Sequence, residues 1–251
     1  MRQGLAKSKN LVSIRILQAI GPGYARDWIT RFGFDPDRHP AYLTMALGAG
    51  SVTPWQMLNA YSIFASGGYR LNVHLISKVT DSSGKVLMEA KPMLVGSDRV
   101  RALDARNAFL MDSLMKEVAR SGTAARASAM LKRGDIAGKT GTTNDSHDAW
   151  FAGYGGDVVA VSWMGFDQPR PLGDRETGGG LALPIWISYM AKSLNGVPEA
   201  VREVPSGVIQ LGGEYYFVEH QPGQGIASVG LEDILAPEEQ VKRESVRDQI
   251  F

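Results

Sequence analysis

The chain has 251 residues, 44% of them hydrophobic and 21% charged, which is ordinary for a folded domain with one sizeable core. The net charge of +1, without a basic cluster, gives no support for nucleic-acid binding, and the lack of cysteine excludes disulfides and thiolate chemistry. The four histidines are scattered and form no zinc-binding pattern, so neither a metal nor an organic cofactor is expected. No apolar run of the sequence is long enough to span a membrane.

The N-terminal part is predicted to be helical. Residues 11–20 form a helix that ends at Gly21-Pro22-Gly23, and residues 24–32 form a short second helix. A third helix covers residues 54–65, with Thr53 as N-cap and Pro54 in its first position. Its helical spacing of apolar residues predicts a core contribution from Trp55, Leu58, Tyr61 and Phe64.

The rest of the chain alternates strands and helices. The predicted elements are a hairpin (73–90), a loop (91–103), a helix (108–118), three strands (135–142, 149–154 and 158–165), a Gly-rich excursion (167–180) and a helix (183–194). Short turns make the three strands antiparallel neighbours. The last strand is apolar on both faces, which predicts a central strand covered by helices on each side. A long excursion of this kind beside a site is commonly functional, and the alternative is that Gly178-Gly179-Gly180 is only a flexible connector.

Lys139-Thr140-Gly141-Thr142, on the first of these strands, is the most informative pattern. Residues two apart on a strand share a face, so Thr140 and Thr142 can both direct hydroxyls at a substrate carboxylate. Gly141 lets a substrate backbone lie close to the strand, and Lys139 brings a positive charge to an anionic substrate terminus. A Lys-Thr-Gly triplet belongs to the motif set of serine acyl-transferases that act on peptidoglycan or on β-lactams.

Ser8-Lys9-Asn10 supplies a Ser-x-Asn element upstream of that strand. A second one, Ser193-Leu194-Asn195, lies downstream and is interpreted as a helix C-terminus beside Gly196. Ser8 and Asn10 directly precede the helical run 11–20, where such residues are good caps. Capping is therefore the structural alternative to a functional role for Ser8 and Asn10.

Residues 1–17 (MRQGLAKSKNLVSIRIL) and 136–154 (IAGKTGTTNDSHDAWFAGY) resemble the class A, bifunctional penicillin-binding proteins of the 1A type. The resemblance implies an α/β (α+β) fold, with an antiparallel sheet covered by helices, of the penicillin-recognising serine transpeptidase or β-lactamase-like type. It also implies that the chain is N-terminally truncated. Residues 1–204 are expected to be the C-terminal portion of the transpeptidase domain, and residues 205–251 a C-terminal extension that is partly ordered.

The resemblance assigns roles to the two motifs. In the resembled mechanism Ser8 relays a proton and Lys139 tunes it, so these two side chains are expected within hydrogen-bonding reach. Asn10 orients the substrate amide, while Thr140 and Thr142 hold the terminal carboxylate. The backbone N–H of Thr142 supplies half of an oxyanion hole.

The attacking serine of the family belongs to a Ser-x-x-Lys element that precedes Ser-x-Asn by several tens of residues. This sequence holds two such strings, Ser82-Ser83-Gly84-Lys85 and Ser113-Leu114-Met115-Lys116. The first falls in the tip of the predicted hairpin and the second in a helix with a core pattern. Both are interpreted as structural, and the nucleophile is predicted to lie upstream of this chain.

The expected function of the parent protein is a peptidoglycan DD-transpeptidase at the periplasmic face of the bacterial inner membrane. Its expected partners are stem peptides, β-lactams and cell-wall synthesis proteins, and no nucleic acid is expected. Contact with the membrane is expected only through an N-terminal anchor that this chain does not include. The alternative is a penicillin-fold domain that senses β-lactams or binds partners without catalysis. A P-loop at residues 134–140 is disfavoured by its glycine spacing and by the absence of a helix-forming sequence after Lys139-Thr140.

Overall fold

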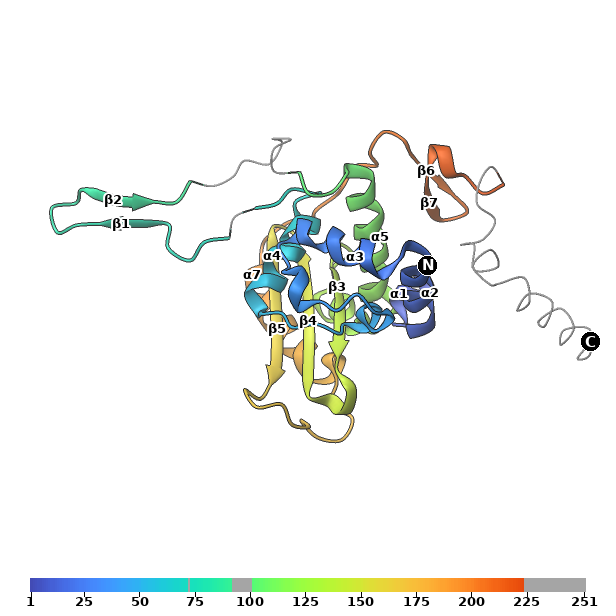
Figure 1. The fold of residues 1–251 in the computed structure, drawn as a ribbon. Coiled ribbons are helices and arrows are strands. Elements are labelled where there is room, and N and C mark those ends of the chain that lie inside the picture. Colours follow the sequence, from blue (N-terminus) through green and yellow to red (C-terminus); the bar gives the residue numbers. More distant parts are fainter. Residues whose placement is uncertain (72, 92–100, 224–251) are drawn as a thin grey trace, which may run out of the picture.

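A computed structural model describes residues 1–71, 73–91 and 101–223. Its centre is an antiparallel sheet in the order β3 (Ala137–Thr142), β4 (Asp148–Gly155) and β5 (Val158–Gly165) (Figure 1). Two small hairpins flank it, β1–β2 (Lys78–Thr80 and Val86–Glu89) and β6–β7 (Val208–Leu211 and Glu214–Phe217). The α-helices are α1 (Arg2–Ala6), α2 (Asn10–Ile20), α3 (Pro22–Trp28), α4 (Pro54–Ala65), α5 (Ala105–Ser121), α6 (Ala125–Leu131) and α7 (Leu183–Ser193).

The sheet is covered on both faces. Alternate side chains of β4 enter different clusters: Phe151 packs edge-on against Trp186 of α7, whereas Tyr154 joins a cluster with residues of α4 and α5. Helix α5 packs along β3 and contributes to both clusters, through Val118 on one side and Met115 on the other. The predicted arrangement of helices over an antiparallel sheet is therefore confirmed.

The central position predicted for the third strand is not seen among the described residues. The three strands follow one another in sequence, so β4 is the middle strand and β5 has only one neighbour among the described residues. Helices α4 and α7 nevertheless contact β5 from opposite faces. The apolar residues on both faces of β5 are explained by helices that cover both faces. Such coverage does not depend on how many strands pair with β5.

Helix α4 begins as the sequence predicts. Thr53 and Gln56 form a reciprocal capping box, and Pro54 occupies the first turn. The predicted core is partly wrong, because Trp55 is 46% exposed and Leu58 only half-buried. The helix buries Ala60 and Ile63 instead, since its later turns rather than its first turn reach the clusters beside the sheet.

The C-terminal hairpin β6–β7 docks on α5. Tyr215 packs edge-on against Phe109 with ring centroids 5.0 Å apart, and Arg106 of α5 pairs with Glu219 at 2.6 Å. Part of the predicted extension thus lies against the main body, while residues 224–251 lie outside the described residues. The division at residue 204 stays a prediction.

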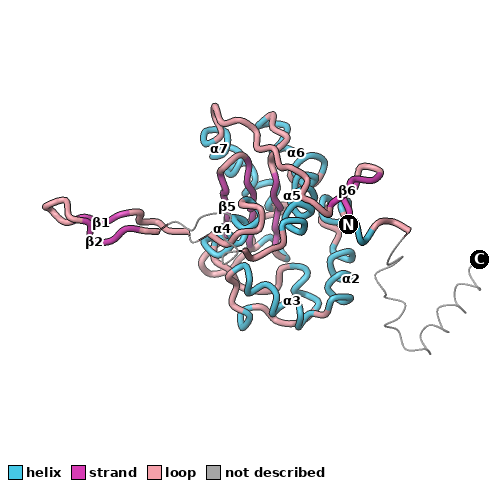
Figure 2. Tube along the Cα trace, turned by 90° about the horizontal axis from the view of Figure 1, so that it is seen from above, coloured by secondary structure: helices cyan, strands magenta, loops and turns pink. Residues whose placement is uncertain are grey.

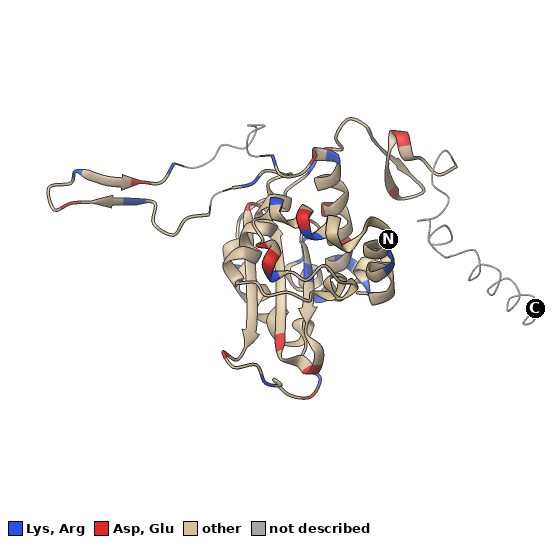
Figure 3. Cartoon of the chain, in the orientation of Figure 1, with Lys and Arg blue, Asp and Glu red and all other residues tan. Residues whose placement is uncertain are grey.

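Charged residues of both signs are interspersed along the chain (Figure 3), in keeping with the net charge of +1. The β1–β2 hairpin projects away from the body in two perpendicular views (Figure 1, Figure 2). None of the helices within residues 1–71, 73–91 and 101–223 combines the length and hydropathy needed to cross a bilayer.

Candidate active site

Strand β3 presents the Lys-Thr-Gly motif to a cavity of about 740 Å³. Lys139, Thr140, Gly141 and Thr142 all line it, because β3 is paired with β4 on one side only within the described residues. The opposite wall is formed by the N-terminal segment, including Ser8, Asn10 and Ser13, and by Ala46, Leu47 and Gly48. The structure therefore brings together all six residues that the sequence singled out.

Ser8 and Lys139 are in direct contact. Lys139 Nζ donates a hydrogen bond to Ser8 Oγ and a second, at 3.0 Å, to the carbonyl oxygen of Thr140. Ser8 lies between α1 and α2 with a left-handed φ of 51°, which a non-glycine residue adopts only where its surroundings hold it there. The predicted proximity of the two side chains is confirmed.

The capping alternative for Ser8 and Asn10 is wrong. The N-cap position of α2 is Lys9, and no side chain caps this helix. Asn10 is already the first helical residue, and its side chain is exposed beside the cavity. The side chains of Ser8 and Asn10 are thus not used to start α2.

Burial lowers the pKa of Lys139 to about 8, from an ordinary value of about 10.4. Desolvation is the cause, because the half-buried ammonium loses water that the sheet and the N-terminal segment replace only in part. Lys139 remains mainly protonated at neutral pH. It is then a cation that a carboxylate would stabilise further.

The hydroxyls of Thr140 and Thr142 lie on the same face of β3, and each already has a protein partner. Thr140 Oγ1 is 2.7 Å from Thr123 Oγ1, and Thr142 Oγ1 accepts a hydrogen bond from Gly178 N at 3.0 Å. Thr142 uses its oxygen there as acceptor only, so its hydroxyl proton is still free to be donated. These two contacts fix the orientation of both threonines.

Backbone alternation also directs an N–H into the cavity. Thr143 N donates to Asp148 O of the neighbouring strand at 3.1 Å. Because successive N–H groups of an antiparallel strand point to opposite edges, the N–H of Thr142 points away from β4, toward the edge of β3 that has no strand partner among the described residues. That direction is the one an oxyanion-hole donor needs.

The sequence did not predict the residues that pack against the Lys-Thr-Gly strand. The interpretation of Gly178-Gly179-Gly180 as a flexible connector is wrong, because these residues form a helical turn that runs into α7 and packs against β3. A Cβ at Gly178 would lie 2.3 Å from the carbonyl oxygen of Gly141. Thr123, in the turn after α5, also contacts the motif through Thr140. No sequence signal links either residue to the motif, since both contacts join segments far apart in the chain.

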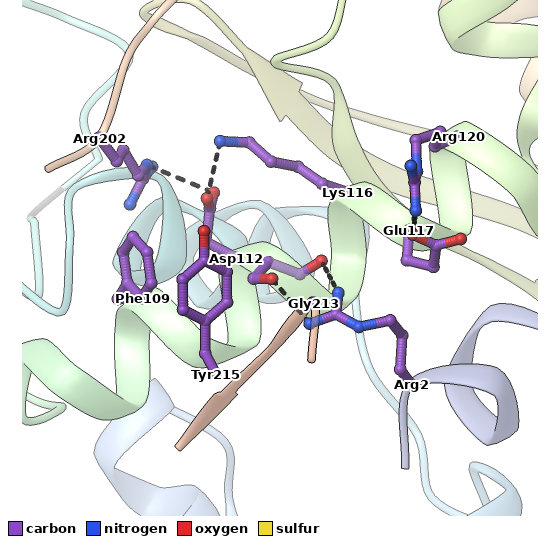
Figure 4. Close-up of a pocket in the computed structure, with 10 residues that line it drawn as sticks. Arg2, Phe109, Asp112, Lys116, Glu117, Arg120, Arg202, Gly213 and Tyr215 are labelled. Atoms are coloured by element: carbon purple, nitrogen blue, oxygen red, sulfur yellow. Dashed lines mark hydrogen bonds and ion pairs between the residues drawn. The ribbon is translucent and has the colours of Figure 1, made fainter. Parts of the chain in front are cut away.

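The two Ser-x-x-Lys strings lie elsewhere. Ser82 sits in the turn of the projecting β1–β2 hairpin. Ser113 lies in α5 and lines a separate cavity, where its Oγ accepts a hydrogen bond from Arg2 Nη2 at 3.0 Å. Figure 4 shows this cavity with Arg2 and Lys116 labelled. Lys116 is paired there with Asp112 at 2.9 Å, so it is no free base for Ser113. Their interpretation as structural residues agrees with these positions.

The P-loop alternative is wrong, because Lys139 and Thr140 lie inside a strand rather than at the start of a helix. Among the described residues no group of three or more His, Asp or Glu side chains is placed to hold a metal ion. The polar groups around Lys139 are hydroxyls, amides and backbone N–H groups. Such a set suits an anionic organic substrate with a reacting carbonyl.

An edge strand with Lys-Thr-Gly, facing a serine on the neighbouring segment, defines the class of penicillin-recognising serine enzymes. The family model for the penicillin-binding protein transpeptidase domain matches residues 1–185, and the chain belongs to that family. The fold predicted from the sequence is thereby confirmed.

The similar proteins belong to the 1A type, as the sequence resemblance implied. Penicillin-binding protein 1A of Neisseria lactamica is 49% identical over 220 residues, covering 88% of this chain and 27% of that protein. Its counterpart from Pseudomonas aeruginosa is 40% identical, covering 84% of this chain and 31% of that protein. A crystal structure of penicillin-binding protein 1A from Haemophilus influenzae matches with a TM-score of 0.80 at 32% identity, over 86% of this chain and 39% of that one. The chain thus spans less than a third of the length of these two curated relatives.

Proposed function

We propose that this chain is the substrate-binding and proton-relay part of a serine DD-transpeptidase that cross-links peptidoglycan stem peptides. The observation that carries the proposal is the contact of Lys139 Nζ with Ser8 Oγ at a cavity that Thr140 and Thr142 also line. A cation, two oriented hydroxyls and an outward N–H suit a peptide that ends in a carboxylate beside a reacting carbonyl. The family match and the 1A-type relatives support the same reaction.

In the proposed reaction a serine Oγ attacks the carbonyl carbon of the penultimate D-alanine, forming a C–O bond. The negative charge that develops on the carbonyl oxygen is stabilised by the N–H of Thr142. The C–N bond then breaks, and Ser8 passes the proton released by the nucleophile to the departing amine of D-alanine, with Lys139 holding the Ser8 hydroxyl. An acceptor amine reverses these steps and releases the serine.

The other residues would hold the donor peptide. Lys139 and the hydroxyls of Thr140 and Thr142 bind its terminal carboxylate, and Asn10 orients the preceding amide. Gly141 lines the same cavity, and a Cβ there would lie 3.2 Å from Cβ of its partner Trp150 on β4. A β-lactam carries a carboxylate and a strained amide at a similar spacing, so it occupies the same groups.

The nucleophile is proposed to be a serine outside residues 1–251. Ser8 and Ser13 line the cavity, but neither has a lysine one helical turn further on, and Ser82 and Ser113 lie away from it. The proposal places the whole enzyme at the periplasmic face of the inner membrane, where stem peptides and other cell-wall synthesis proteins are available. A non-catalytic β-lactam sensor would share the binding groups but would keep its acyl group.

The direct test is the full-length protein that contains this chain, incubated with a fluorescent penicillin and mapped by peptide mass analysis. The proposal expects a single adduct on a serine outside residues 1–251, and transfer of a donor peptide to an added D-amino acid. An adduct on Ser113 or Ser82, or no adduct at all, would contradict it. An adduct that forms without any peptide transfer would favour the sensor.

A further inference from the structure

The turn that follows helix α5 touches both halves of the proposed site. Thr123 N donates to the carbonyl oxygen of Ala6 at 3.0 Å, and Lys7 Nζ donates to the carbonyl oxygen of Ser121 at 2.5 Å. Ala6 is completely buried at this junction. The end of α1, which leads directly to Ser8, is therefore held by hydrogen bonds to the end of α5.

Gly122 makes that approach possible. A Cβ on Gly122 would lie 2.3 Å from the carbonyl oxygen of Ala6 and 2.8 Å from that of Val118. Its φ of −96° is open to any residue, so the glycine is required by the closeness of α1 and not by backbone strain. A helix of only five residues has little stability of its own, and this contact supplies a fixed position for it.

The side chain of the next residue reaches the other half of the site. Thr123 Oγ1 is 2.7 Å from Thr140 Oγ1, and Thr123 lines the same cavity as Ser8 and Lys139. One of the two hydroxyls must donate in this pair. If Thr123 donates, Thr140 accepts, and the proton of Thr140 is free to point at a carboxylate in the cavity.

We infer that Thr123 is a positioning residue with two contacts. Its backbone N–H holds the segment that leads to Ser8, and its hydroxyl donates to Thr140 Oγ1, so that the Thr140 proton points into the cavity. The inference rests on the proposed function, since it assigns Thr140 to carboxylate binding. It predicts two separable effects. Loss of the hydroxyl weakens recognition of the carboxylate, whereas a clash at Gly122 displaces Ser8 and slows the chemical step.

The first test compares Thr123→Val with Thr123→Ser in the full-length protein. Acylation by benzylpenicillin and by its methyl ester is measured for each variant relative to wild type. Thr123→Val is expected to lower the rate constant for the free acid about tenfold, as loss of a hydrogen bond linked to a charged group does, with an unchanged rate for the ester. Thr123→Ser keeps the hydroxyl and restores the acid rate. Wild-type rates in Thr123→Val, equal losses for acid and ester, or no rescue by serine would each overturn the inference.

The second test uses Gly122→Ala, with the thermal unfolding midpoint as a check of folding. We expect a lower maximal acylation rate for acid and ester alike, with the apparent penicillin affinity retained, because Ser8 moves while Thr140 stays. A maximal rate equal to wild type in a folded Gly122→Ala protein would contradict the positioning of Ser8. A wild-type protein that no penicillin acylates would instead overturn the proposed function, and this inference with it.

Discussion

Ser8 Oγ accepts a hydrogen bond from Nζ of Lys139, a residue 131 positions further along the chain. The contact joins a loop between two short helices to the edge of the central sheet. Packing of α1 on α5 and of α5 on β3 brings the two segments together. The proposed proton relay through this pair would avoid the cost of reorganising its members during the reaction.

Ser8→Ala should lower the transpeptidation rate by about a hundredfold or more, since a positioned acid–base group contributes that much. Ser13→Ala is the matched control, because Ser13 lines the same cavity from α2 but is not bonded to Lys139. Single-turnover rates on a donor peptide measure the difference. Equal rates in the two variants would remove Ser8 from the relay.

Acylation by benzylpenicillin should fall as the pH rises through about 8, because Lys139 then loses the charge that binds the carboxylate. The methyl ester lacks this carboxylate and should give a flatter profile. Folding stability responds in the opposite sense: between about pH 8 and 10.4 the unfolded chain binds more protons at Lys139, so this group favours the folded state increasingly as the pH rises. An acid profile that stays level up to pH 9.5 would contradict the assignment.

Gly178→Ala should destabilise the fold by about 1–3 kcal/mol, as overpacking of a filled site does. Its Cβ would lie 2.3 Å from the carbonyl oxygen of Gly141 and 2.4 Å from that of Trp150. Gly180→Ala is the control, since its Cβ would lie 3.4 Å from Thr177 Oγ1. Urea unfolding of both variants compares them, and a Gly178→Ala protein as stable as Gly180→Ala would show that the turn can shift freely.

Asp112→Ala should cost about 1–3 kcal/mol, because it leaves the buried Tyr154 hydroxyl without its acceptor and removes the counter-charge of the half-buried Lys116 and Arg202. Asp112 is 2% exposed and contacts Tyr154 at 2.9 Å, Lys116 at 2.9 Å and Arg202 at 3.3 Å. Asp104→Ala removes only the exposed N-cap of the same helix and should cost about 1 kcal/mol. If the two variants unfold at the same urea concentration, the contacts of Asp112 contribute no more to the free energy of unfolding than the exposed N-cap does.

Local patterns were enough to predict most elements and to single out the Lys-Thr-Gly strand, whereas the roles of the six candidate site residues stay a prediction. Apolar alternation and short turns located β3, β4 and β5, and Thr53-Pro54 marked the start of α4. The motif Lys139 to Thr142 could be assigned because each residue type has a chemical reason to be there. The Ser8 contact followed from the family resemblance, since spacing along the chain says nothing of distance across a fold.

The predictions that failed concern residues whose structure depends on contacts with segments far away in the sequence. Strand β5 has the composition of a central strand because helices cover both of its faces, and composition records coverage rather than neighbours. Gly178 has the composition of a flexible segment, yet the carbonyl of Gly141 is what requires a glycine there. Thr123 lies in a helix stop, and its bond to Thr140 exists only after α5 packs along β3.

The central claim is that Lys139 supplies the cation of a penicillin-acylated site, and the acylation rate of Lys139→Ala in the full-length protein tests it most directly. Lys132→Ala, at an exposed lysine after α6, is the control. The account predicts that Lys139→Ala reduces the stopped-flow acylation rate constant by about a hundredfold or more, as loss of one preorganised electrostatic group does, while Lys132→Ala acylates like wild type. A Lys139→Ala protein that acylates at the wild-type rate would contradict the account.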